Sequence, residues 1–215
     1  MKKIFYTLII TLLTIPAFAQ SSQEARTLLD NVSKAYHNKS SFYLKFNTVL
    51  NNSATGTKDS YDGEIYVKDD KYNLAVPKMD IRQIYDGFKL YTISSETKEI
   101  TITKPDADSD ELFTPTRVLD MYKSGYNLSM DGVRKVNAKN VTFVKLTPNN
   151  ASKGLKHVLV GIDRNSHEMV QLIEVNNNNT TTTLTIEKQL SDIIVPKSIL
   201  TFNKNFFKDY YISEI

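Results

Sequence analysis

The sequence contains no cysteine among its 215 residues. This absence excludes disulfide bonds, zinc sites with thiolate ligands and a cysteine nucleophile. It also removes the residue on which a bacterial lipid anchor is built, so we do not expect the protein itself to be lipid-anchored. Glycine is scarce, with seven residues, whereas Thr, Asn, Tyr and Ile are common. This balance favours an all-β body.

Motifs of common catalytic and nucleotide-binding sites are also lacking. The sequence has no G-x-S-x-G nucleophile turn and no phosphate-binding P-loop. The three histidines, His37, His157 and His167, have no partners at the spacing of a metal site. His37 instead ends a predicted helix, where a cation suits the helix dipole.

One acidic stretch resembles the start of a calcium loop, with Asp106, Asp108 and Asp110 at alternate positions. The glycine expected next is Glu111, and the twelfth position holds Arg117 instead of glutamate. A solvated loop is therefore the better interpretation. We expect no catalytic residue, no metal and no cofactor, and hence not an enzyme.

Residues 1–19 have the form of a cleaved secretory signal. Lys2 and Lys3 precede an apolar run over 4–15, and Ala17-Phe18-Ala19 has the small-x-small form of a cleavage site. The run is shorter than the roughly 20 residues of a membrane span. We expect a mature chain from Gln20 that is free in the periplasm; a retained membrane anchor is the alternative.

The charge of the predicted mature chain is close to neutral. Without Lys2 and Lys3, 25 of the 27 basic residues remain against 24 acidic residues, a net charge of +1. The charges are interspersed and form no basic stripe, so no nucleic-acid partner is indicated. The length of residues 20–215 fits a single domain, which we expect to be a monomer.

The predicted secondary structure is mostly antiparallel strand. Ser21-x-x-Glu24 is a capping box that predicts a helix reaching His37. Period-two alternation then predicts a strand over 42–50 and, after a polar connection at 51–59, a meander over 62–103. A second helix is predicted from Thr114 to Tyr122.

From Gly125 onward the alternation predicts further strands, with Asp131-Gly132 as one of the turns and a possible edge segment over 206–215. The predicted strands are 126–130, 141–146, 155–162, 169–175, 180–188 and 199–202. The total is about ten strands and two helices, without the strand–helix repeat of a parallel sheet. We expect a mainly β (α+β) fold, an unclosed antiparallel barrel or curved sheet whose helices close its open side.

The order of these segments resembles the LolA family of periplasmic lipoprotein carriers. The strand pair Gly63 to Leu74, the hairpin Ile84-Tyr85-Asp86-Gly87-Phe88-Lys89-Leu90-Tyr91 and the helix start Thr114-Pro115 are similar to family motifs. Leu146-Thr147-Pro148 is similar to the family's L-x-P turn, and the match covers nearly the whole of 20–215. Tryptophans common in the family are absent; Leu74 and Tyr91 stand in their places.

The resemblance implies helices that form a lid over an apolar cavity for acyl chains. Its partners would be acylated lipoproteins and an inner-membrane lipoprotein-releasing ABC transporter; a receptor in the outer membrane is left open. The family's lid arginine is missing here, and Lys68 or Asp69 occupies its place as a possible gating residue. The predicted cavity residues are Leu28, Val32, Phe42, Leu44, Phe46, Ile65, Val67, Tyr72, Leu74, Val76, Leu90, Val118, Leu119 and Tyr122.

Apolar alternation does not distinguish a hollow interior from a filled core, so the same residues could form an ordinary core. Two other functions also remain open. One is a lipid-sensing or regulatory module on the same fold, which would bind an acylated ligand and hand it to no partner. The other is a secreted hydrolase with a scattered active site, for which the sequence offers no acid/base constellation.

Overall fold

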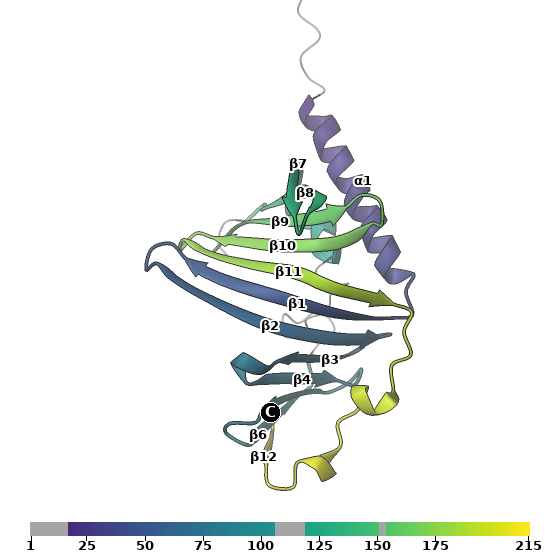
Figure 1. Ribbon diagram of the computed structural model, residues 1–215, viewed down its shortest axis with the longest axis vertical. Helices are drawn as coiled ribbons and strands as arrows, with labels where there is room; N and C mark the ends of the chain where they lie inside the picture. Colours follow the sequence, from purple (N-terminus) through teal and green to yellow (C-terminus); the bar gives the residue numbers. More distant parts are fainter. Residues whose placement is uncertain (1–16, 106–118, 151–153) are drawn as a thin grey trace, which may run out of the picture.

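The computed structural model describes residues 17–105, 119–150 and 154–215 (Figure 1). Its main element is a single curved sheet of twelve strands in the order β12-β6-β5-β4-β3-β2-β1-β11-β10-β9-β8-β7. The helix α1 (Ala17–His37) runs beside the β7–β10 end of the sheet. The strands are β1 Ser41–Asn52, β2 Thr57–Lys68, β3 Lys71–Val76, β4 Ile81–Tyr85, β5 Leu90–Ser94, β6 Glu99–Thr103, β7 Tyr126–Val136, β8 Lys139–Pro148, β9 Leu155–Asp163, β10 Glu168–Asn176, β11 Thr180–Ser191 and β12 Tyr211–Glu214.

The sheet is not closed, because its two edge strands, β7 and β12, do not pair with each other. The chain enters the middle of the sheet at β1 and proceeds outward to β6. It then restarts at the far edge with β7 and returns strand by strand until β11 pairs with β1. The expected unclosed, mainly β architecture is thereby confirmed.

The predicted edge segment at the end of the chain exists, but it pairs in an unexpected direction. β12 lies parallel to β6, with Tyr211 opposite Glu99. Every other pair of neighbouring strands among the described residues is antiparallel. The expectation of a purely antiparallel sheet is therefore wrong at this one edge.

The helix α1 presents the apolar stripe that the sequence predicts. Ala25, Leu28, Leu29, Val32 and Tyr36 recur at helical spacing, and all five are buried. We name the side of the sheet on which these residues pack the inner face. The stripe fixes α1 across the inner face of the β7–β10 end.

The predicted start of the helix at Ser21 is wrong, because α1 already begins at Ala17. Ser21 does not act as an N-cap. Its Oγ accepts a hydrogen bond from the backbone N–H of Met130, 3.1 Å away. The serine therefore links α1 to β7. The start of the helix was predicted four residues too late because the capping-box pattern lies inside a longer helix.

Two further predictions of local structure are wrong. The polar connection predicted over 51–59 belongs mostly to β1 and β2, whose tight hairpin pairs Asn52 with Thr57. Asp131-Gly132 is no turn but a bulge within β7, where the register shifts between Met130 and Val133. The turn itself comes at Asn137-Ala138, where both residues have positive φ, as a tight hairpin requires.

The strand predicted over 199–202 is also absent. Residues Lys197–Leu200 form the 3₁₀ helix η4, in which the Ile199 N–H donates to the Pro196 carbonyl. The side-chain amide of Asn73 donates to the Ile199 carbonyl across 2.6 Å. The Ile199 carbonyl therefore accepts from a side chain and not from the backbone of a neighbouring strand. The apolar residues at 199–202 belong to a segment that packs on the sheet without joining it. Within the described ranges, the other short 3₁₀ helices are η1 Pro77–Met79, η2 Met121–Lys123 and η5 Lys204–Phe206.

From β4 onward the meander also buries apolar side chains on the face opposite the inner face. Leu74 points to the inner face, whereas Ile84, which pairs with Asn73, belongs to a separate cluster on the outer face. That cluster is covered by the chain after η4, in which Phe202 stacks on Tyr91 at 4.4 Å. One half of the meander is therefore covered from inside and the other by the C-terminal segment.

No helix within residues 17–105, 119–150 and 154–215 is both long and apolar enough to cross a membrane.

Candidate functional site

The structure gathers the predicted cavity residues on the inner face. Twelve of the fourteen are buried in one cluster with α1, and Val76 is half-buried against it. Val118 lies outside the described residues. The twelve are Leu28, Val32, Phe42, Leu44, Phe46, Ile65, Val67, Tyr72, Leu74, Leu90, Leu119 and Tyr122. Clustering was thus predicted correctly, while their role as a lining for acyl chains stays a prediction.

A groove of about 260 Å³ opens on the inner face next to this cluster. We call it the apolar groove. Only three predicted residues, Phe46, Leu74 and Val76, contribute to its lining. The full lining is Phe46, Thr48, Leu74, Val76, Leu172, Glu174, Thr182 and Leu184. It joins β1, β3, β10 and β11, so the curvature of the sheet brings together strands that are not neighbours in it.

A glycine in the adjacent strand sets the position of Phe46. Gly63 of β2 pairs with Phe46 of β1, and a Cβ placed on Gly63 would lie 2.5 Å from Phe46 Cζ. The ring therefore occupies the space that a side chain on β2 would take. Because Phe46 lies against the sheet here, the groove beside it stays open.

Among the described residues that line the apolar groove, Glu174 is the only one with an ionisable side chain. It follows Leu172 by two residues in β10, so both side chains face inward. Burial raises the pKa of its carboxyl, and no neighbouring charge contributes to the shift. Sequence analysis missed this residue because only apolar positions were taken as lining; the period-two continuation from Leu172 was the available signal.

A larger recess, of about 570 Å³, lies beside the first turns of α1 and has a different character. Seven of its eight described lining residues are polar or charged, and the guanidinium of Arg164 donates to Glu24 at 2.5 Å. Leu28, a predicted cavity residue, contributes to this recess and not to the apolar groove. A polar lining is unsuited to an acyl chain, so we take the smaller apolar groove as the candidate site.

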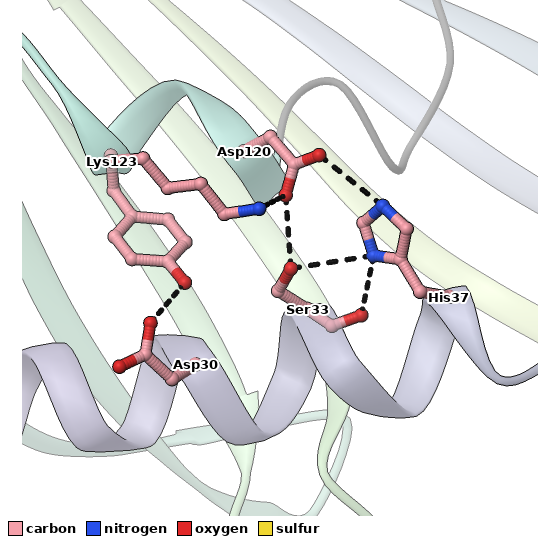
Figure 2. A network of polar contacts seen from close by, with 6 residues as sticks. Asp30, Ser33, His37, Asp120 and Lys123 are labelled. Carbon is pink, nitrogen blue, oxygen red and sulfur yellow. Dashed lines mark hydrogen bonds and ion pairs between the residues drawn. The ribbon is translucent and has the colours of Figure 1, made fainter.

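The segment that follows residue 118 is fastened to α1 by polar contacts, shown in Figure 2. The Tyr122 hydroxyl donates to Asp30 Oδ1 at 2.5 Å, and Ser33 Oγ donates to Asp120 Oδ1 at 2.9 Å. Asp120 also forms ion pairs with Lys123, at 2.7 Å, and with His37, at 3.3 Å. We call this set the helix clasp: Asp30, Ser33, His37, Asp120, Tyr122 and Lys123.

The helix clasp surrounds an apolar contact. Leu119 and Tyr122 are each about 1% exposed and belong to the inner cluster. Leu119 and Asp120 are helical and lead into η2. The part of the predicted second helix before residue 119 lies outside the described residues, as does the acidic loop at 106–111. The clasp therefore holds one buried segment against α1.

His37 has a specific place in the clasp. Its Nδ1 lies 2.8 Å from the Ser33 carbonyl oxygen, and its Nε2 lies 3.3 Å from Asp120 Oδ2. Because both ring nitrogens face oxygen acceptors, only the doubly protonated ring can donate to both. The predicted position at the helix end is confirmed.

The two possible gating residues lie away from the apolar groove. Lys68 ends β2 opposite Ser41, and Asp69 follows in the β2–β3 turn with φ of 56°. Both are exposed. The described lining of the groove contains no residue of β2 or of the β2–β3 turn, so the structure does not bring Lys68 or Asp69 together with it. A gating role for them stays a prediction.

Within the described ranges, no group of three or more His, Asp or Glu side chains is arranged to hold a metal ion.

Comparison with known proteins identifies a family that matches most of the chain. The profile of the family described as "Outer membrane lipoprotein carrier protein LolA" matches residues 15–205. No curated protein matches the chain in sequence. Among solved structures, an uncharacterised conserved protein from Thermus thermophilus superimposes with a TM-score of 0.62 at 9% identity, over 90% of this chain and 100% of its own.

Two other solved structures are more distant. A LolA superfamily protein from Nitrosomonas europaea has a TM-score of 0.42 at 9% identity, covering 83% of this chain and 97% of its own. The MucA/MucB complex of Pseudomonas aeruginosa includes a chain with a TM-score of 0.44 at 13% identity, covering 84% of this chain and 61% of its own. The Thermus thermophilus match, at 9% identity, bears on the fold alone, and the two more distant matches support no conclusion about this chain.

Proposed function

We propose, from the premise that this chain belongs to the outer membrane lipoprotein carrier protein LolA family, that it carries the acyl chains of lipoproteins in its apolar groove. In this proposal it receives acylated lipoproteins from an inner-membrane ABC transporter and ferries them across the periplasm to the outer membrane. It acts as a binding protein and not as an enzyme. A receptor in the outer membrane could complete the route.

The observation that carries the proposal is the apolar groove on the inner face, continuous with the cluster under α1. Transfer of an acyl chain from water into such surroundings is worth about 0.8 kcal/mol per methylene. Burial of about ten methylenes would therefore supply about 8 kcal/mol, before the costs of ordering the chain. Carriage by burial needs no nucleophile or metal.

The groove has to widen to take such a ligand. Its volume of about 260 Å³ is below the roughly 300–1,000 Å³ of sites that enclose drug-sized ligands. The helix clasp is the natural point of opening, because Leu119 and Tyr122 are held on α1 by a few side-chain contacts. Release of this segment would extend the apolar surface next to the groove.

The test is a release assay with the mature protein, residues 20–215, and energised spheroplasts that carry newly made lipoproteins. The carrier should draw acylated lipoproteins into the soluble fraction as a complex. Leu74→Glu, which places a charge in the groove lining, should abolish release. Leu190→Glu is the matched control, because Leu190 pairs with Tyr43, is 42% exposed and lies outside the groove.

A second variant guards against misfolding. Leu184 is half-buried in the groove wall, so Leu184→Glu should keep the circular dichroism spectrum of the wild type and still lose release. If both groove variants fold and release lipoproteins normally, the groove is not the site. If the wild type binds fatty acids but releases no lipoprotein, a lipid-sensing module on the same fold is favoured over a carrier.

A further inference from the structure

The carboxyl of Glu174 lies in the lining of the apolar groove, where it makes no contact with the described residues that would stabilise the fold. Its neighbours across the two adjacent strands are Val158 and Thr182, which offer no cation. No hydrogen bond or ion pair connects its carboxyl to another side chain in the part of the chain that the structure describes. The other polar residues in the described part of the lining are Thr48 and Thr182.

A carboxyl in this position weakens the fold. Burial raises its pKa, which means that the apolar surroundings disfavour the ionised form. A half-buried carboxylate without a partner costs stability, and an apolar residue at position 174 would extend the lining formed by Leu172. Groups that reduce stability are typical of binding sites, where a ligand supplies the missing partner.

We propose that Glu174 binds an ammonium group at the polar end of the carried amphiphile, so that the groove selects amine-bearing lipids or lipopeptides. This inference rests on the proposed function and specifies its ligand. The carboxylate is an acceptor without donors, and an ammonium group is a donor without acceptors. The hydroxyls of Thr48 on β1 and Thr182 on β11 supply further acceptors in the lining.

Charge complementarity favours the ammonium group over other polar ends. A carboxylate ligand would face Glu174 as a like charge, and a hydroxyl ligand would make only a neutral–ion hydrogen bond. Among hydrogen bonds, those between two charged groups are the strongest, more so where water is partly excluded. Because the groove is partly open, we expect a preference of about tenfold and not the larger factor of a fully buried pair.

The test compares three amphiphiles with the same twelve-carbon chain: dodecylammonium, dodecanol and dodecanoate. Each is titrated at pH 8 against the mature protein loaded with the neutral dye N-phenyl-1-naphthylamine, the two ions below their micelle concentrations and dodecanol below its solubility limit, and the loss of dye fluorescence is measured. The wild type should bind dodecylammonium about tenfold more tightly than dodecanol, and dodecanoate most weakly. Glu174→Gln should bind all three with similar affinity.

Glu96→Gln is the matched control. Glu96 lies exposed in the turn between β5 and β6, so the same charge is removed far from the groove. It should keep the wild-type order of affinities. If dodecylammonium and dodecanol bind equally to the wild type, or if Glu174→Gln keeps the preference, the inference is overturned while lipid carriage stands. If none of the three displaces the dye, the proposed function itself fails, and the inference with it.

Discussion

The contact between Tyr122 and Asp30 sets how readily the helix clasp opens, and Tyr122→Phe tests it. The substitution removes one hydroxyl and leaves the buried ring, which is about 1% exposed, in place. In the wild type this hydroxyl donates to Asp30 Oδ1 at 2.5 Å. Burial, followed by the nearby Asp30 carboxylate, raises the pKa of Tyr122, so the hydroxyl keeps its proton.

The size of the effect follows from the kind of hydrogen bond. Bonds to charged groups contribute about 1.5–3 kcal/mol. Asp30 is exposed and regains water when its partner is lost, so we expect the low end, about 1.5 kcal/mol. That value corresponds to about a tenfold increase in the population with the clasp open.

Hydrogen exchange measures that population directly. The amides of 121–123 should lose about tenfold of their protection in Tyr122→Phe, and stopped-flow uptake of an apolar dye should accelerate by a similar factor. Tyr211→Phe is the control, because Tyr211 is 70% exposed on β12. Unchanged exchange at 121–123, or an equal loss of protection throughout β8, would refute the view that this contact governs local opening.

Three further outcomes are expected. Gly63→Ala should lower the free energy of unfolding by about 1–3 kcal/mol, measured in urea, because the new Cβ would lie 2.5 Å from Phe46 Cζ; an unchanged midpoint would contradict the packing described. Glu174→Gln should raise Tm by a few degrees at pH 8 and leave Tm unchanged at pH 4. Burial raises the carboxyl pKa in the folded state, so the wild type loses stability as the pH rises through that pKa. A gain in Tm that persists at pH 4 would exclude the charge as its cause. Phe202→Ala should cost about 2 kcal/mol in thermal unfolding, because it removes the ring stacked on Tyr91 at 4.4 Å, and no loss would show that the C-terminal segment does not stabilise the outer face.

Much of the fold follows from alternation in the sequence. The strands of the meander, the stripe on α1 and the gathering of the inner cluster are all confirmed. Alternation does not state which face of the sheet an apolar residue takes. Ile84 and Leu74 are equally apolar, yet they face opposite sides. The choice depends on the segment around Phe202, which lies far along the chain and covers one side only.

The candidate site was harder to predict than the fold. Of the fourteen predicted residues only Phe46, Leu74 and Val76 line the apolar groove. The others that the structure describes belong to the buried cluster beneath α1, because an apolar side chain packs in the same way in a core and in a cavity wall. Glu174 was missed for the opposite reason: it is charged, and the sequence analysis took only apolar positions as lining, although its spacing of two residues from Leu172 places it on the same face of β10.

The pairing of β1 with β11 has a consequence for the order of folding. It joins two meanders, β1–β6 and β7–β11, and each meander pairs strands that follow one another along the chain. The contacts that join the meanders span well over a hundred residues, as between Phe42 and Ser191. Such distant contacts form late, because a long loop must first close. The apolar groove straddles this seam, with Phe46 on one side and Leu184 on the other. A half-folded chain therefore has no lipid site, and binding becomes available only after the two halves have met.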